Sequence, residues 1–255
     1  MPLRLPFGSW WLLRNDQLGA ALLEDTFEPA EYRFVERFLQ PGMTVLDIGA
    51  NQGYYTLLSS RKVGARGKVL AFEPSPREMR HLKLHLLLNR CINVEVISSA
   101  LGAATGTAEL HLVQGPESGC NSLRPPNVSL ATSLLTVPVE CLDEVLEARG
   151  INHVDFIKLD VEGAELSVLQ GAPELLRCLP RPVILAEVQE IRTHPWGYRA
   201  AEILSSLSAQ GYRWFVVNSV GRLDKLSVTR ETYDGNFVAI PQERIASLNH
   251  FFCSE

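Results

Sequence analysis

The sequence predicts an α/β fold in which helices cover both faces of a doubly wound, mainly parallel β-sheet. Short β-type segments alternate with amphipathic helical segments along the chain. Most of the β-type segments are apolar on both faces, which is typical of strands in a covered parallel sheet. The chain has 255 residues, 46% of them hydrophobic, so it can bury a full core as one domain.

The predicted strands are short, and helical segments separate most of them. Residues 236–252 add one more strand and a closing helix. No internal repeat or low-complexity segment interrupts this order. The main β-type segments span residues 43–49, 68–73, 93–98, 154–160, 182–188 and 212–217.

Two helical segments show the spacing that a helix lying on a sheet requires. In residues 75–90 the apolar side chains recur near helical spacing and polar ones fill the remaining positions. Residues 163–179 repeat the pattern, but Gly171 and Pro173 predict a break or kink partway. The apolar positions expected to face the sheet in the first helix are Met79, Leu82, Leu86 and Leu87.

An insertion follows the third predicted strand, where the alternation loosens from about Gly102 to Pro138. Residues 105–112 resemble one half of a β-hairpin, and residues 113–133 are rich in Gly, Pro, Ser and Asn. Loops of this length inside a compact domain tend to be lids or binding loops. The length of the loop around 115–135 is therefore typical of a lid or a binding loop, while the sequence leaves its role open.

The N-terminal 42 residues are predicted to be a leader that packs on a domain formed by residues 43–255, with a second, less favoured role in covering a substrate. Arg14, Asn15 and Asp16 interrupt its apolar stretch, so no transmembrane segment is predicted.

Charge and cysteine usage restrict the class of protein. The formal net charge of −5 and the pI of about 5.7 give no general reason to bind nucleic acid. Five cysteines occur singly without zinc-site spacing, which favours a reduced, cytoplasmic protein. The sequence predicts no oligomeric state. The cysteines are Cys91, Cys120, Cys141, Cys178 and Cys253.

The turn after the first strong strand is the first place to look for a ligand, because ligands of open parallel sheets bind beyond the carboxyl ends of the strands. Gly49 and Gly53 allow a sharp bend and close approach to a ligand, and Asn51 tolerates a positive φ. Asp47 precedes the first glycine and would repel a pyrophosphate, so it favours a cationic ligand. The glycines could also serve only a tight turn, and Asp47 only a helix cap.

Glu73 supports the ligand interpretation. It lies 20 residues beyond Gly53 at the end of the second strand, where a carboxylate accepts hydrogen bonds from both hydroxyls of a ribose. A ribose acceptor combined with an anionic loop predicts S-adenosylmethionine rather than NAD. An NAD-dependent oxidoreductase on the same sheet remains an alternative.

Several stretches resemble, in order, the motif series of the FkbM family of class I methyltransferases. They are VLDIGANQGYYTLL, AFEPSPREMRHLKLHLLLN, SALG, CLDEVL, VDFIKLDVEGAELSVLQGA and VILAEV. The resemblance covers roughly residues 28–217. It implies a Rossmann-like, seven-stranded sheet with an antiparallel last strand, S-adenosylmethionine as cofactor with S-adenosylhomocysteine as product, and usually O-methylation.

The resemblance also implies which residues hold the cofactor. It places the turn around the methionine part, Glu73 with Pro74 at the ribose, and residues 98–102 beside the adenine. Many class I methyltransferases carry an acid at this last position, whereas this chain has Ser98 and Ser99. The expected cofactor-binding residues are Asp47, Gly49, Ala50, Asn51, Gly53, Glu73, Pro74, Ser99, Ala100 and Asp160.

The acceptor side is predicted at the ends of the fourth and fifth strands. Asp160 and Glu187 end neighbouring strands, so two carboxylates could position a hydroxyl, remove its proton or bind Mg²⁺. No third ligand has a fixed spacing, so no metal is predicted. His194 is a candidate general base, although a lone loop histidine is more often a surface residue. For Glu162 and Glu165 a structural role at a helix N-terminus is favoured.

The sequence therefore predicts a cytoplasmic, S-adenosylmethionine-dependent O-methyltransferase. Its expected acceptor is a small molecule or glycan, with the methyl group going to a hydroxyl of a sugar or of a glycosylated or polyketide-like metabolite. N-methylation of a peptide side chain is the alternative within the same family. The expected catalytic residues are Asp160, Glu187 and His194.

Overall fold

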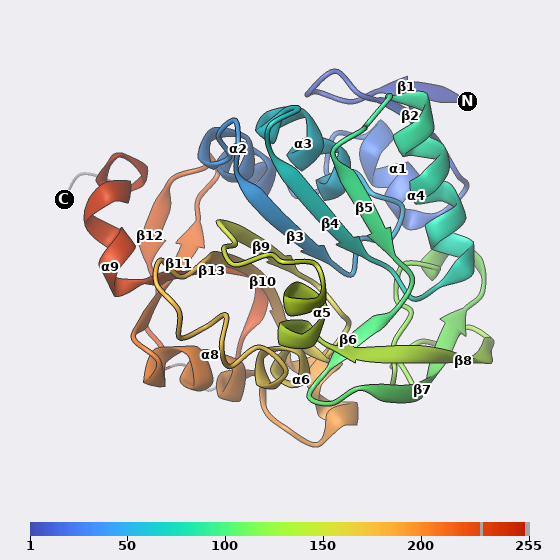
Figure 1. Cartoon of the computed structure of the whole chain (residues 1–255). Helices are drawn as coiled ribbons and strands as arrows, with labels where there is room; N and C mark the ends of the chain where they lie inside the picture. Colours follow the sequence, from blue (N-terminus) through green and yellow to red (C-terminus); the bar gives the residue numbers. More distant parts are fainter. Residues whose placement is uncertain (230–231, 253–255) are drawn as a thin grey trace.

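The computed structural model describes residues 1–229 and 232–252 and has the predicted α/β fold (Figure 1). Its strands are β1 Pro2–Arg4, β2 Trp10–Leu12, β3 Thr44–Ile48, β4 Lys68–Phe72, β5 Val94–Ile97, β6 Ala100–Gly102, β7 Gly106–Val113, β8 Thr132–Cys141, β9 Phe156–Leu159, β10 Val183–Gln189, β11 Tyr212–Val217, β12 Leu223–Lys225 and β13 Asp234–Pro241. Its α-helices are α1 Gln17–Leu23, α2 Pro29–Phe38, α3 Tyr54–Val63, α4 Pro76–Leu88, α5 Leu142–Ala148, α6 Glu165–Gln170, α7 Glu190–Thr193, α8 Ala200–Ala209 and α9 Gln242–Ile245. Short 3₁₀ helices span Gly115–Glu117, His194–Trp196 and Ala246–Phe251.

The central sheet has the strand order β12-β11-β13-β10-β9-β3-β4-β5. Strands β5, β4, β3, β9 and β10 pair in parallel, whereas β13 is antiparallel to both of its neighbours, β10 and β11. These seven strands have the arrangement that the resemblance implies, with the last of them antiparallel. The short strand β12 extends the sheet beyond them at the β11 edge.

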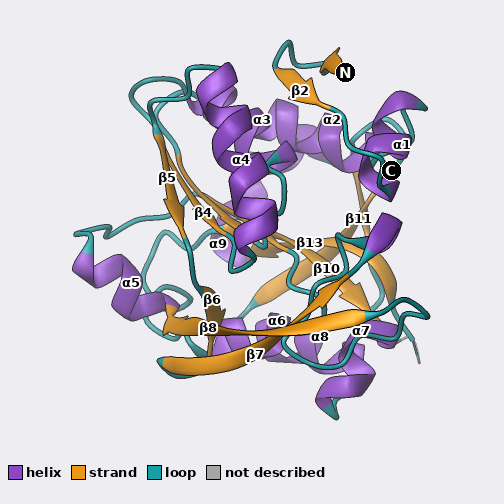
Figure 2. Ribbon diagram, turned by 90° about the vertical axis from the view of Figure 1, so that its right-hand side faces the viewer, coloured by secondary structure: helices purple, strands orange, loops and turns teal. Residues whose placement is uncertain are grey.

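Helices cover both faces of the sheet (Figure 2). Neighbouring residues of one strand point to opposite faces, so Val45 belongs to one buried cluster and Leu46 to the other. The Val45 cluster contains side chains of α2, α3 and α4, and the Leu46 cluster contains side chains of α5, α6 and α8. The apolar β-type segments therefore have the covered environment that their sequence predicts.

The two predicted helices form, with one correction for each. Helix α6 ends at Gln170, directly before Gly171, so the expected break is a helix end. Helix α4 starts after the N-cap Ser75 and buries Leu82 and Leu86, as expected. Leu87 was expected on the sheet side, but it is 76% exposed because its position faces away from the sheet.

The insertion is more ordered than the sequence predicts. Residues 106–113 form β7, which pairs antiparallel with β8, while β8 pairs in parallel with β6. Together they form a small three-stranded sheet beside the central one (Figure 1). The loop between β7 and β8 spans residues 114–131, so the last residues of the 115–135 segment belong to β8.

The N-terminal residues pack against the sheet domain. Leu5, Phe7 and Trp11 belong to the same buried cluster as α2 and α3. Within residues 1–229 and 232–252, no helix has the length and apolar character that crossing a membrane requires. Cys91, Cys120, Cys141 and Cys178 are free thiols, and Cys253 lies outside the described residues.

Candidate active site

A cavity of about 370 Å³ lies at the carboxyl ends of the parallel strands, a volume within the range of small-molecule sites. Its wall contains all of the sequence-predicted site residues except Gly53 and His194. Three parts of the chain form it: the ends of the central strands, the N-terminal segment from Asp16 to Glu28, and the insertion from Pro116 to Leu123.

The turn after β3 is bent by residues that accept positive φ. Gly49 has φ +85°, and an added Cβ atom there would lie 1.7 Å from the carbonyl oxygen of Asp160. Asn51 has φ +51°, as expected from its tolerance of this region. Gly53 has φ +95° and supports the turn from behind, because an added Cβ atom would contact Leu82 rather than the cavity. Helix α3 begins at Tyr54, directly after this turn.

Glu73 is fixed by two backbone amides. Its Oε2 accepts from the Asn51 N–H at 2.7 Å and its Oε1 accepts from the Ser75 N–H at 2.7 Å. Burial raises the pKa of the Glu73 carboxyl to about 8, although these two hydrogen bonds favour the charged form. Each oxygen keeps a second lone pair, so the carboxylate can still accept from ligand hydroxyls.

Asp47 lies deeper in the same wall. It is buried and accepts a hydrogen bond from the Thr56 hydroxyl, and burial raises the pKa of its carboxyl to about 6. The nearby Asn51 Oδ1 atom is buried and has no hydrogen-bond partner among the described residues. Ser99, which follows β5, also lines the cavity, and its hydroxyl donates to Glu140 of β8.

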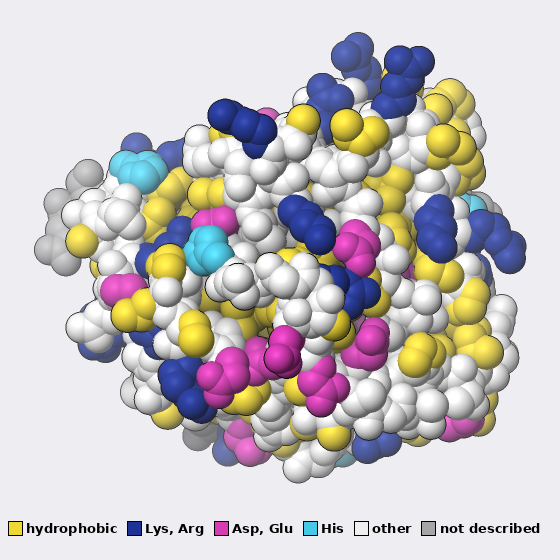
Figure 3. Space-filling model, in the orientation of Figure 1, with side chains coloured by type: hydrophobic (Ala, Val, Ile, Leu, Met, Phe, Trp, Pro, Cys, Tyr) yellow, Lys and Arg dark blue, Asp and Glu magenta, His cyan; other side chains and the backbone are white. Residues whose placement is uncertain are grey.

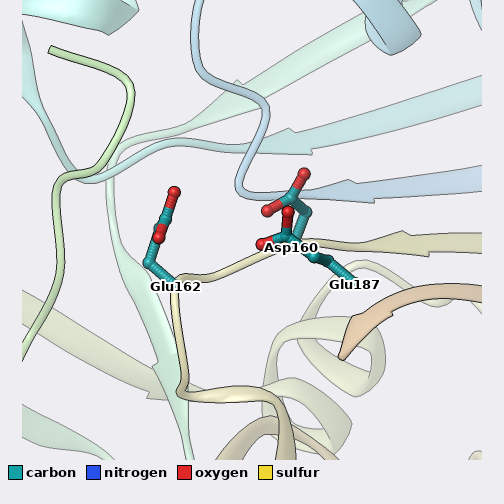
Figure 4. Close-up of side chains that lie close together, drawn as sticks. All are labelled: Asp160, Glu162 and Glu187. Atoms are coloured by element: carbon teal, nitrogen blue, oxygen red, sulfur yellow. The ribbon is translucent and has the colours of Figure 1, made fainter. Parts of the chain in front are cut away.

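Asp160, Glu162 and Glu187 come together at the other end of the cavity, and one carboxylate oxygen of each lies within 4.8 Å of the other two (Figure 4). Glu187 is in β10, while Asp160 and Glu162 follow β9. Glu162 has φ +55°, and its side chain lines the cavity instead of capping a helix. A structural role was expected for Glu162 and Glu165, and the structure shows it only for Glu165. The Glu165 carboxylate accepts from the N–H groups of Val161 and Gly163.

Two of the three carboxylates have a cationic partner. Lys158 Nζ lies 3.0 Å from Asp160 Oδ2, and Arg192 Nε lies 2.8 Å from Glu162 Oε2. The backbone of Glu187 pairs with Asn236 in the sheet, but its side chain has no hydrogen-bond or ion-pair partner among residues 1–229 and 232–252. Its side chain is therefore available to a ligand.

The pKa values of two of these acids, Glu162 and Glu187, are raised. Burial raises the pKa of Glu187 well above its usual range, and the charges of Asp160 and Glu162 add to this. Burial also raises the pKa of Glu162 to about 8, with Arg192 opposing the shift. Perturbed carboxyls grouped in a cavity are typical of functional sites.

Sequence reasoning missed Lys158 and Glu28, which join this site to the N-terminal segment. Lys158 Nζ also donates to Asn236 Oδ1 at 3.2 Å, and Asn236 Nδ2 donates to Glu28 Oε1 at 2.9 Å. The hydroxyl of Tyr55 donates to the other oxygen of Glu28. Burial alone would lower the pKa of Lys158. The negative charges of Asp160, Glu28 and Glu187 outweigh this effect of burial, so the pKa of Lys158 is raised.

The insertion covers the cavity and is held from two sides. Arg77 of α4 donates to the carbonyl groups of Val113 at 2.8 Å and Ser118 at 3.0 Å. The hydroxyl of Ser122 donates to the carbonyl of Glu162 at 2.9 Å. The loop is therefore held both by α4 and by the turn after β9.

The structure does not bring His194 to the cavity. It lies in the 3₁₀ helix that follows α7, and it is not among the described residues that line the cavity. The loop around it packs on the turn after β9, since the Tyr198 hydroxyl donates to the carbonyl of Gly163 at 2.5 Å.

This chain is similar to several known methyltransferases. Among curated proteins, methyltransferase sdnD from Sordaria araneosa is 30% identical over 51% of this chain and 60% of its own length. Methyltransferase 1 from Beauveria bassiana is 30% identical over 50% of this chain and 57% of its own length. The chain thus spans about three fifths of these relatives.

Among solved structures, the methyltransferase FkbM from Methylobacillus flagellatus KT has a TM-score of 0.49 and 17% identity, covering 89% of this chain and 56% of that one. The sequence model of the methyltransferase FkbM domain matches residues 47–214, which is well over half of the chain. This match includes the turn after β3, Glu73, and the three acids at the ends of β9 and β10. The chain belongs to the FkbM family of class I, S-adenosylmethionine-dependent methyltransferases.

Proposed function

We propose that this chain transfers a methyl group from S-adenosylmethionine to a hydroxyl of a sugar or of a glycosylated or polyketide-like metabolite. The observation that carries the proposal is the group of three carboxylates, Asp160, Glu162 and Glu187, in the wall of the cavity. An acceptor hydroxyl needs a hydrogen-bond acceptor to orient it and a base to take its proton. Asp160 can orient the hydroxyl, and Glu187, whose pKa is raised, can take its proton.

The residues on the β3–β4 side fit the cofactor. Asn51 Oδ1 is a buried acceptor without a partner among the described residues, which suits the amino group of the methionine part. Glu73 presents two fixed carboxylate oxygens for the ribose hydroxyls. Gly49 leaves the turn without a side chain. When bound, the cofactor supplies a methyl group activated by its sulfonium.

The acceptor side suits a proton transfer that Asp160 and Glu187 share. Lys158 fixes the carboxylate of Asp160, which can accept from the hydroxyl and orient it. As the oxygen of the acceptor hydroxyl gains the methyl group, Glu187 takes the proton of that hydroxyl. The raised pKa of Glu187 makes it a stronger base than an ordinary carboxylate, which suits a weakly acidic hydroxyl.

The insertion and the N-terminal segment would exclude water and select the acceptor. Both contribute to the wall of the cavity, and both are tied to the carboxylate side, by Ser122 and by Glu28 respectively. A methyl transfer depends mainly on alignment in a dry site. Neither segment has to carry a reacting group for this role.

Transfer of a ¹³C-labelled methyl group from S-adenosylmethionine tests the proposal. The acceptor panel contains glycosides, hydroxylated polyketides and peptides, and NMR of the product distinguishes an O-methyl from an N-methyl group. We expect O-methyl products, and about 10²–10⁴-fold slower transfer by Glu187→Gln, because a positioned base contributes about this factor.

Glu147→Gln is the matched control, since Glu147 is an exposed glutamate on α5, and it should leave the rate unchanged. Labelled methyl groups on peptide nitrogen would contradict the O-methyl assignment and favour the alternative acceptor. An unchanged rate in Glu187→Gln would contradict the role of Glu187.

A further inference from the structure

The outward face of helix α4 carries apolar side chains that are exposed and do not pack against the sheet. Leu87 is 76% exposed and Ile92, just beyond the helix, is 86% exposed; Leu84 and Leu88 are also exposed. Because residues three and four apart share one side of a helix, Leu84, Leu87 and Leu88 form a single stripe. We call this stripe, with Ile92 and the exposed Trp10, the α4 face.

Trp10 is held in place beside the end of the helix. Its backbone N–H donates to Asn89 Oδ1 at 2.6 Å, and Asn89 Nδ2 donates to the carbonyl of Trp10 at 2.7 Å. The next residue, Trp11, is buried and stacks on His85 of α4, with ring centroids 4.0 Å apart. The exposed indole ring of Trp10 therefore belongs to a fixed part of the surface.

Cations surround the α4 face. Arg80 and Lys83 are on the same side of the helix as the leucines, and Arg90 follows its end. None of the three has an ion-pair partner within the described part of the chain. In Figure 3, hydrophobic side chains in the region of α4 lie near groups of Lys and Arg side chains.

The charge of this region is opposite to that of the whole chain. Residues 76–92 contain four cations and one acid, Glu78, and residues 1–15 contain two arginines and no acid. Glu78 is buried and paired with Arg14 and Arg77, so it contributes little negative charge to the surface. Elsewhere the chain is acidic, since its formal net charge is −5.

We propose that the α4 face binds the surface of an anionic lipid membrane. An amphipathic helix with Leu on one side and Lys and Arg beside them is typical of interfacial binding, in which apolar side chains enter the headgroup region and the cations contact acidic lipids. A tryptophan at the edge of such a surface sits at the headgroup level. Charge complementarity favours acidic lipids over zwitterionic ones.

Cosedimentation with vesicles tests the proposal on the whole chain. Vesicles of phosphatidylcholine with phosphatidylglycerol are compared with vesicles of phosphatidylcholine alone, at low and at high NaCl. We expect binding to the first kind, much weaker binding to the second, and loss of binding at high salt because screening weakens the contact of the cations with the lipids. Arg80→Glu with Lys83→Glu should reduce binding at least about tenfold, since each cation contributes about 1 kcal/mol, a factor of about five.

Leu84→Ser with Leu87→Ser should also reduce binding severalfold. The matched control is Leu179→Ser with Lys225→Glu, which removes one exposed leucine and one exposed cation elsewhere and should leave binding unchanged. Lipids brominated near the headgroups should quench the fluorescence of Trp10. This quenching should be absent in Trp10→Phe.

Equal binding to both kinds of vesicle, or no binding to either, would overturn the proposal. Size-exclusion chromatography with light scattering gives a further outcome: a dimer that becomes a monomer in the leucine variant, together with no vesicle binding, would make the α4 face an interface between copies of this chain. None of these readouts depends on methyl transfer, so they are independent of the proposed function.

Discussion

The Nζ atom of Lys158 lies 3.0 Å from Oδ2 of Asp160, and Lys158 is buried among the carboxylates at the end of the cavity. The register of the sheet also pairs Lys158 of β9 with Asp47 of β3. One buried cation thus stands between Asp47 of β3 and Asp160, which follows β9.

Lys158→Met should destabilise the protein by roughly 3–5 kcal/mol, because it leaves buried negative charge without its partner. Urea unfolding measures the change. The double variant Lys158→Met with Asp160→Asn should recover part of the loss. Lys68→Met is the control, since its pair with Glu95 is half exposed and worth less than about 1 kcal/mol. An equally small effect of both single changes would refute the stabilising role of Lys158.

The pH dependence of kcat/KM should show that a carboxyl with a raised pKa must lose its proton. Activity is expected to rise with pH as Glu187 ionises, because only its charged form can accept the proton of the hydroxyl. Glu162→Gln removes a neighbouring negative charge, which lowers the pKa of Glu187 and moves this rise to lower pH. A pH–rate profile that does not move, or that moves to higher pH, would exclude Glu187 as the base.

Arg77→Ala should loosen the insertion, since the guanidinium of Arg77 holds two of its carbonyl groups. We expect faster proteolysis within residues 114–123 and about a tenfold increase in KM for the acceptor, with a smaller change in kcat, since the loop positions the substrate rather than reacting with it. Arg80→Ala on the same helix is the matched control, because Arg80 is exposed and has no ion pair within the described residues. Equal proteolysis of both variants would contradict the role of Arg77.

Removing divalent cations should leave the rate of methyl transfer nearly unchanged. Asp160, Glu162 and Glu187 offer oxygen ligands of the type that Mg²⁺ prefers, but Lys158 and Arg192 already neutralise part of their charge. The assay is run with EDTA and then with added Mg²⁺. If EDTA abolishes the activity and Mg²⁺ restores it, the three acids are a metal site and not a site of direct proton transfer.

Much of the cofactor side could be predicted from the sequence, because it depends on local features of strand ends and turns. Gly49 and Asn51 adopt the positive φ values that their residue types favour. The carboxyl ends of neighbouring parallel strands necessarily lie together, so Asp160 and Glu187 were expected to meet. The parallel order of the sheet followed from the same alternation of elements.

The rest of the site depends on long-range contacts that spacing does not reveal. Asn236 links Glu28 to Lys158 by hydrogen bonds, and it lies on β13, near the end of the sequence. Glu162 turns into the cavity because its own φ is positive; the glycine that follows it in the DVEG turn was the available signal. Leu87 was assigned to the sheet side because four apolar positions near helical spacing span a wider arc than the sheet covers.

The central claim is that the cavity between Asp47, Glu73 and Asp160 binds S-adenosylmethionine, and calorimetry with S-adenosylhomocysteine tests it most directly. We predict binding to the wild-type protein, at least about tenfold weaker binding to Glu73→Ala because two ribose hydrogen bonds are lost, and unchanged binding to the control Glu95→Ala on β5. No binding to the wild-type protein, or equal binding to Glu73→Ala, would contradict the account.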